Sequence, residues 1–210
     1  SNFMSTGDIE CAFYSFMLPP GLEKFFTLPP ISASTLGIKH IAGCRVKAGE
    51  RVTPTLRVLP MGWNWALHVV HCVLVRCMIL ALGLLGVSAD DARRLLVLDG
   101  RPPPSPEPGR PPLFPYVDNA LMLAWDDDEA LELSRALSYV FHRFGLKFRI
   151  ECDGEPWHDA LGVSMLIGER VIINRANRMW RLRCALVELR VQGRASGDVM
   201  QVINGHVVYS

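Results

Sequence analysis

Apolar residues along the chain fall mostly into short runs, which are typical of β-strands. Residues 3–18 begin as a strand and continue as a short helical or irregular piece, which Pro19 and Pro20 end. The apolar stretch 22–31 predicts another short strand. Residues 32–58 alternate between apolar and polar positions in two places, which favours two or three antiparallel strands joined by loops.

Residues 63–87 form the most apolar part of the chain. The segment 66–87 has 22 residues, the length of a membrane span. Arg76 lies at its middle, where a charge costs about 2.5 to 3.5 kcal/mol, and His68 and His71 add polarity. We therefore interpret this segment as a buried helix under a sheet, with a membrane span as the alternative. The two histidines could bind a metal, but no carboxylate accompanies them, so packing or surface roles are preferred.

Trp125 and the acidic residues 126–129 open a second helix, which Gly145 ends. Acidic side chains in a first turn interact favourably with the helix macrodipole, so capping explains this acidic run without a metal site. The apolar face of the helix is expected to comprise Ala130, Leu133, Leu137, Val140, Phe141 and Phe144.

The remaining segments predict two strand regions, 146–152 and 160–173, then a helix over about 174–189 and a short helical piece at 196–210. The insertion 99–115 is different, because seven prolines between positions 102 and 112 exclude a helix or a central strand. We expect an exposed, partly extended loop there. A ligand for a proline-recognition domain is the alternative.

The composition bounds the class of protein. A chain of 210 residues that is half apolar can bury a complete core, as one domain or one and a half. Its net charge is +1, but residues 116–165 hold ten acids and four bases, whereas residues 166–210 hold seven arginines and three acids. An acidic centre followed by a basic end suits a metal site beside a phosphate-binding surface, although two ordinary solvated faces would give the same pattern.

Six scattered cysteines without a CxxC pair favour reduced thiols in an intracellular protein, nuclear or cytoplasmic, over a disulfide framework or a zinc site. The start of the chain lacks the features of a signal peptide. Because Ser1 precedes a candidate catalytic aspartate by only seven residues, we expect the chain to be a fragment of a longer protein.

Asp118 and Asn119 lie between two short apolar runs and predict a β-hairpin with a carboxylate at its tip. A carboxylate at such a tip can bind a metal ion, although this pair of residues by itself favours an ordinary hairpin turn. The metal-binding interpretation gains support from two further stretches, 7–13 and 59–63, which lie upstream of this hairpin in a fixed order.

Five motifs, in the right order, resemble those of a reverse transcriptase palm. The segment 8–13 is similar to the first palm motif, an aspartate followed five residues later by an aromatic, and 59–66 is similar to the second. Residues 116–119 are similar to the third. Residues 145–148 and 161–163 match the fourth motif and the primer-gripping hairpin in order and spacing. The match covers nearly the whole chain and points to retrotransposon-type enzymes.

The resemblance implies an α+β fold, with a polymerase palm of antiparallel sheet backed by helices over 1–173, and the truncated beginning of a thumb over 174–210. It also implies RNA-directed DNA synthesis as part of a longer retroelement polyprotein. The partners would be an RNA or DNA template with its primer, deoxynucleoside triphosphates and the rest of the polyprotein, with no membrane. The fingers would precede Ser1, so the isolated chain is expected to be inactive. The alternative is a non-catalytic remnant or a nucleic-acid-binding scaffold.

The implied chemistry is in-line phosphoryl transfer with two Mg²⁺ ions about 3.5 to 4 Å apart. By resemblance Asp8 and Asp118 would bind the ions, and the backbone carbonyl of Ile9 would complete the site. Asn119 stands where the family usually has a second aspartate, so one negative charge is lost. Because Mg²⁺ prefers anionic ligands, we expect weakened binding of one ion and better activity with Mn²⁺.

The resemblance also implies contacts to the nucleotide and the primer. Phe13 would lie against the sugar and exclude a 2′-hydroxyl, although a core aromatic is the plain alternative. Met61 and Gly62 would lie beneath the incoming base and sugar, with Met61 replacing a glutamine of many family members. The residues expected at the template-primer are Tyr116, Val117, Leu161, Gly162, Arg175, Arg178 and Arg181.

Overall fold

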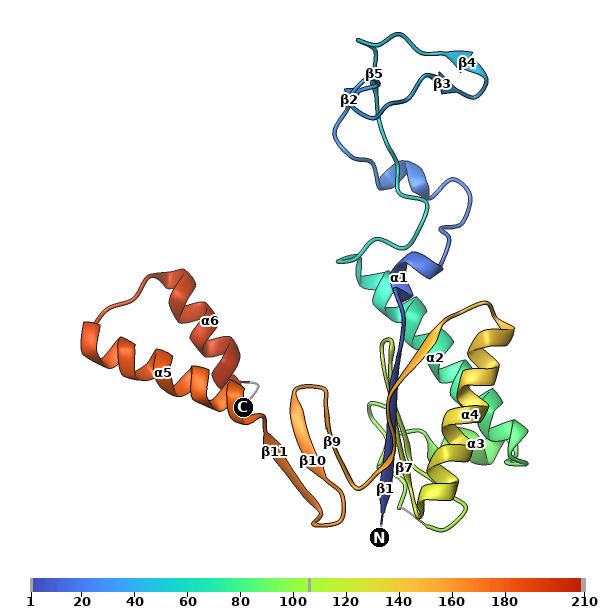
Figure 1. Ribbon diagram of the computed structural model, residues 1–210, viewed down its shortest axis with the longest axis vertical. Helices are drawn as coiled ribbons and strands as arrows, with labels where there is room; N and C mark the ends of the chain where they lie inside the picture. The colour runs from blue at the N-terminus through green and yellow to red at the C-terminus, as the bar shows by residue number, and fades with distance from the viewer. Residues whose placement is uncertain (1, 106, 209–210) are drawn as a thin grey trace.

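The computed structural model describes residues 2–105 and 107–208. Within them the chain is a mixed α+β protein with antiparallel sheets and six α-helices, as expected (Figure 1). The elements in chain order are β1 (Phe3–Ile9), α1 (Ala12–Ser15), the 3₁₀ helix η1 (Glu23–Phe25), β2 (Ile31–Ser32), β3 (His40–Ile41), β4 (Cys44–Arg45), β5 (Arg51–Val52), α2 (Asn64–Leu84), α3 (Ala89–Leu95), β6 (Leu113–Tyr116), β7 (Asn119–Ala124), α4 (Asp127–Arg143), β8 (Phe148–Glu155), β9 (Trp157–Ala160), β10 (Val163–Leu166), β11 (Val171–Asn174), α5 (Ala176–Gln192) and α6 (Gly197–Val208).

The central sheet has the strand order β6-β7-β1-β8, and every pair in it is antiparallel. Strand β1 therefore lies between the predicted hairpin and β8. Side chains alternate between the two faces of a strand. Ile9 and Ala120 belong to the core that includes α2 and α4, whereas Met4 and Leu121 pack against the second sheet, β11-β10-β9. In Figure 1 these helices lie on one side of the central sheet and β9–β11 on the other.

The predicted position and capping of helix α4 (Asp127–Arg143) are confirmed. The Asp126 side chain accepts a hydrogen bond from the Glu129 N–H at 2.9 Å, which satisfies one free donor of the first turn. Phe141 is fully buried and stacks on Phe148 with 4.9 Å between ring centroids. The prediction for Phe144 is wrong: it is 59% exposed, because the helix ends at Arg143 and Phe144 has left the apolar face.

Helix α2 is the predicted apolar helix. One side of it is buried in the core, where Val70, Leu74 and Met78 are fully inaccessible to solvent. Among the described residues, α2 is also the one helix that is long and apolar enough to cross a membrane by length and composition.

The segment from β2 to β5, residues 31–52, stands away from the rest of the molecule (Figure 1), whereas Leu22 and Phe26 before it pack against the main core. The strand predicted over 22–31 is wrong: the segment forms a turn, where the Glu23 carboxylate accepts the Gly21 N–H at 2.7 Å, and then η1. Before β2, pairing in this segment is limited to an isolated antiparallel bridge between Thr27 and Thr55; β2 then pairs with β5, and β3 pairs with β4. The predicted short antiparallel strands within 32–58 are confirmed.

The proline-rich insertion is shorter than predicted. Its exposed part ends at Arg110, because Pro111 and Pro112 are buried and residues 113–115 belong to β6. Pro115 is tolerated there since β6 is an edge strand, where a missing N–H removes no ladder hydrogen bond. Residue 106 lies outside the described residues. Helix α3 before the loop was not predicted; the Ser88 hydroxyl caps it by accepting the Asp91 N–H at 3.2 Å.

The C-terminal part follows the predicted order of elements. The strand expected over 146–152 is β8, and the region 160–173 contains β10 and β11, while β9 was not predicted. Helices α5 and α6 correspond to the segments expected at 174–189 and 196–210, of which residues 209–210 lie outside the described part.

Candidate active site

The pairing of β1 with β7 brings Asp8 and Asp118 together. Asp8 is the cross-strand partner of Asn119, and the backbone N–H of Ile9 donates to the carbonyl of Asp118 at 3.0 Å. The two aspartates are 110 positions apart in the chain. The sheet thus places these four predicted site residues side by side at the end of β1.

Asp118 lies in a two-residue turn, because Tyr116 pairs with Asn119 and leaves Val117 and Asp118 between the strands. Val117 has a φ of 58°, whereas Asp118 is not among the positive-φ residues, which is the sign pattern of a type II′ turn. Glycine is preferred at the first position of such a turn. A β-branched residue there is strained, and strain of this kind persists only where surrounding contacts hold it.

Three contacts hold this hairpin. The Asn119 amide nitrogen donates to the Asp118 carboxylate at 2.9 Å. The Val117 N–H donates to Nδ1 of His71 on α2 at 3.4 Å, and the Val117 side chain packs against the main core. The third contact is the Ile9 hydrogen bond to the Asp118 carbonyl. The turn is therefore tied to β1 and to α2.

Asp8 has a cationic partner that the sequence did not predict. Arg149 on β8 is its cross-strand neighbour, and the Arg149 Nε donates to the Asp8 carboxylate at 3.0 Å. Nη2 of Arg149 also contacts the Glu151 carboxylate at 3.2 Å. Attraction to Asp8, followed by the hydrogen bond itself, raises the pKa of the Arg149 guanidinium, so it stays protonated. The alternation of Arg149 and Glu151 in a strand was the signal that they share a face.

Some of the side chains at this site are suitable ligands for a hard divalent cation, and others are not. Asp8 and Asp118 supply carboxylate oxygens, the ligand type that Mg²⁺ prefers. Arg149 competes for Asp8, and Asn119 adds no charge. Over residues 2–105 and 107–208, no group of three or more His, Cys, Asp or Glu side chains is placed to hold a metal ion.

The residues predicted to contact a nucleotide lie beyond the same end of β1. Phe13 is in α1, is partly buried and packs against the core, as its plain alternative required. Met61 is 66% exposed in the turn before α2, where Gly62 has a φ of 89°. The Tyr14 hydroxyl contacts the Met61 sulfur at 3.5 Å, so α1 and this turn meet.

Five of the seven predicted template-primer residues form a second group, in the β9–β10 turn and at the start of α5, whereas Tyr116 and Val117 belong to the hairpin. Leu161 and Gly162 make the turn between β9 and β10, both with positive φ. Gly162 lines a groove of about 670 Å³ together with Arg175, Arg178 and Arg181. A Cβ built on Gly162 would lie 3.4 Å from a terminal nitrogen of Arg178, so the glycine permits this close approach. Arg175, Arg178 and Arg181 therefore line one groove, and their predicted contact with a template-primer stays a prediction.

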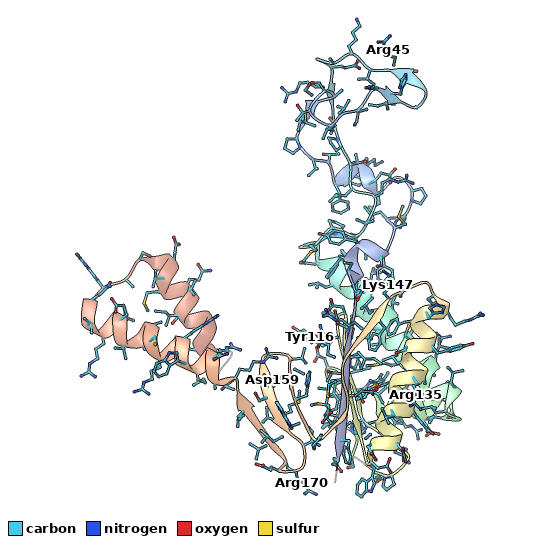
Figure 2. The ribbon with its side chains drawn as sticks, in the orientation of Figure 1. Arg45, Tyr116, Arg135, Lys147, Asp159 and Arg170 are labelled. Carbon is cyan, nitrogen blue, oxygen red and sulfur yellow. The ribbon has the colours of Figure 1, made fainter. Side chains whose placement is uncertain are left out.

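A small cavity of about 220 Å³ lies between the two groups. Asn119 and Glu151 line it from the central sheet, and Asp159, Leu161 and Arg175 line it from the other side. Asp159 and Arg175 form an ion pair at 3.4 Å. Figure 2 shows Tyr116 on the hairpin and Asp159 on the neighbouring sheet. Tyr116 is 60% exposed, as a contact to a large ligand requires.

No protein-family model matches the chain, and no curated protein matches it in sequence.

Proposed function

We propose that this chain is the palm of an RNA-directed DNA polymerase, with the beginning of a thumb, from a longer retroelement polyprotein. The observation that carries the proposal is the placement of Asp8, near the end of β1, beside the turn that holds Asp118, with the Ile9 N–H bonded to the Asp118 carbonyl. Two carboxylates that converge from separate strands are what two-ion phosphoryl transfer needs. The order of the five motifs along the chain supports the same activity.

Asp8 and Asp118 would hold the divalent ions, with the Ile9 carbonyl as a further oxygen ligand. Bound ions of this kind activate a primer 3′-hydroxyl and stabilise the triphosphate leaving group. Arg149 would release Asp8 as a cation binds, because the two compete for one carboxylate. Asn119 would orient Asp118 through its 2.9 Å hydrogen bond, but supplies no charge, which favours Mn²⁺ over Mg²⁺.

Phe13 would select deoxynucleotides by a clash with a 2′-hydroxyl, and Met61 and Gly62 would support the incoming nucleotide. Exposure of Met61 supports this placement, and packing of Phe13 against the core favours a fixed ring position. The groove lined by Arg175, Arg178 and Arg181 would bind the phosphates of the duplex, with Tyr116, Val117, Leu161 and Gly162 nearer the primer end.

The test is primer extension by the complete translated product that contains this chain, on an RNA template with a DNA primer. Wild-type protein should incorporate deoxynucleotides faster with Mn²⁺ than with Mg²⁺. Asp8→Ala and Asp118→Ala should each abolish incorporation. Asp126→Ala, which removes an exposed helix cap, is the matched acidic control and should retain it. Full activity of the Asp118→Ala protein would refute the proposal.

The second candidate is a non-catalytic scaffold that binds nucleic acid. It is favoured by the Arg149 contact, because a guanidinium already neutralises Asp8, and by the uncharged Asn119. A scaffold would retain a primed template on a filter, with affinity that falls as salt rises, yet would incorporate nothing in either metal. Retention that is equal in wild type and the Asp118→Ala protein, without extension, would establish this reading.

A further inference from the structure

His71 lies on α2 next to the buried residue Val70 and reaches the candidate catalytic hairpin. Its neighbours Val70 and Leu74 are fully buried, which fixes this part of the helix in the core. Its ring nitrogen Nδ1 accepts the Val117 N–H at 3.4 Å, a long hydrogen bond. His71 is thus a polar contact between a rigid helix and a strained turn.

The contact gives a hydrogen-bond acceptor to the Val117 N–H, which has no partner in the ladder between β6 and β7. Val117 lies in the turn between β6 and β7, and within the described residues its N–H donates to His71 alone. On the opposite side of the turn, the Asp118 carbonyl accepts from Ile9 at 3.0 Å. With a φ of 58°, Val117 has a strained conformation that these ties help to hold.

We propose that His71 is a positioning residue, which holds Val117 in its left-handed conformation and so directs Asp118 toward Asp8. Nδ1 must carry no proton to accept this hydrogen bond, so the neutral tautomer protonated on Nε2 is the one that holds the turn. The structural part of the proposal concerns the hairpin alone. Its consequence for metal binding and catalysis rests on the polymerase function proposed above.

The surroundings of His71 allow it to be replaced. His71 lines a cavity of about 510 Å³ with His68, Asp99 and Tyr116, so side chains of other shapes can be accommodated. His71→Asn keeps an acceptor oxygen where Nδ1 stands, whereas His71→Leu removes it. His68→Leu is the matched control: His68 lines the same cavity one turn earlier, but contacts Cys72 rather than the hairpin.

The first measurement is amide hydrogen exchange at Val117, followed by NMR. The His71→Leu protein should exchange about two- to tenfold faster than wild type at this amide, the range expected for one lost hydrogen bond. The His71→Asn protein should approach the wild-type rate, and the His68→Leu protein should match it. Unchanged exchange in the His71→Leu protein would overturn the proposal, whether or not the chain is a polymerase.

The second measurement follows Mn²⁺ binding by electron paramagnetic resonance and primer extension by steady-state kinetics. His71→Leu should weaken Mn²⁺ binding and lower kcat by about two- to tenfold with little change in the KM for primed template, and His71→Asn should restore both. Adding Val117→Gly to His71→Leu should recover part of the loss, because glycine adopts positive φ without support. Faster exchange with unchanged Mn²⁺ affinity and kcat would reduce His71 to a packing residue and overturn the positioning role.

These outcomes separate the two proposals. If Asp118→Ala leaves Mn²⁺ binding and extension unchanged, the polymerase function fails while the exchange result still decides the His71 contact. If Asp118→Ala abolishes both but His71→Leu changes neither binding nor exchange, the function stands and this inference is wrong.

Discussion

Asn119→Asp restores the negative charge that the candidate site lacks, and the structure allows its cost to be worked out. The Asn119 nitrogen lies 2.9 Å from the Asp118 carboxylate, so the substitution replaces a hydrogen bond by two close carboxylates. Like charges about 4 Å apart repel by about 1 kcal/mol at the dielectric constant of water and about 4 kcal/mol at a dielectric constant of 20. Both side chains are partly exposed, so an intermediate value applies.

With the lost hydrogen bond, metal-free Asn119→Asp protein should be about 2 to 3 kcal/mol less stable than wild type. For a chain of this length that lowers Tm by roughly 5 to 10 °C. Asn119→Ala loses the hydrogen bond without adding charge and should lose only about 1 kcal/mol.

Divalent cations should reverse this order. The new carboxylate strengthens cation binding, and a ligand that binds only the folded state stabilises it by mass action. Thermal melts should therefore show a larger Mn²⁺-dependent rise in Tm for Asn119→Asp than for wild type, and primer extension at limiting Mg²⁺ should increase. If metal-free Asn119→Asp has the same Tm as Asn119→Ala, and if Mg²⁺ and Mn²⁺ raise neither its Tm nor its rate of primer extension, position 119 does not belong to a cation site.

Four further outcomes are expected. Arg149→Gln removes the competitor for Asp8 and should tighten Mn²⁺ binding in paramagnetic resonance titrations. Arg178→Ala should lower the slope of log affinity against log salt for primed template by about 0.9, in filter-binding titrations, if it contacts one phosphate. Leu74→Ala should cost about 2 to 5 kcal/mol in urea melts, because Leu74 is fully buried. Burial raises the pKa of the Cys77 and Cys152 thiols to about 11. In the folded protein at about pH 8 both thiols should therefore resist alkylation, and their alkylation rate should increase on unfolding or as the pH rises toward 11.

Local signals explain which elements could be predicted from the sequence. The helix α4 carries an acidic cap, an apolar stripe and a closing glycine, and all three act within a few residues. The hairpin around Asp118 has apolar runs of strand length on both sides. The segment 22–31 is also apolar, but it has no long strand to pair with, so turns and η1 form instead. Its conformation depends on distant contacts, which composition does not report.

The candidate site likewise contains residues that could be predicted from the sequence and residues that could not. Asp8 and Asp118 were placed together by resemblance, and the register of β1 with β7 puts them there. Arg149 and His71 are different, because each reaches the site across a strand or helix whose register no local pattern sets. Arg149 was visible only as one charge in an alternating strand, and His71 only as a polar residue on an apolar helix.

The charge balance around Asp8 shows why Arg149 decides between the two proposed functions. Asp8, Asp118, Glu10 and Glu151 contribute four negative charges there and Arg149 one positive charge, a formal total of −3. Two-ion catalysis adds four positive charges, partly offset by a bound triphosphate. Arg149→Gln changes the total to −4 by loss of a cation, and Asn119→Asp does so by gain of an anion. In a polymerase both changes should therefore strengthen cation binding. In a scaffold, Arg149→Gln should instead weaken nucleic-acid binding and leave cation affinity unchanged, because the guanidinium itself would be the functional cation.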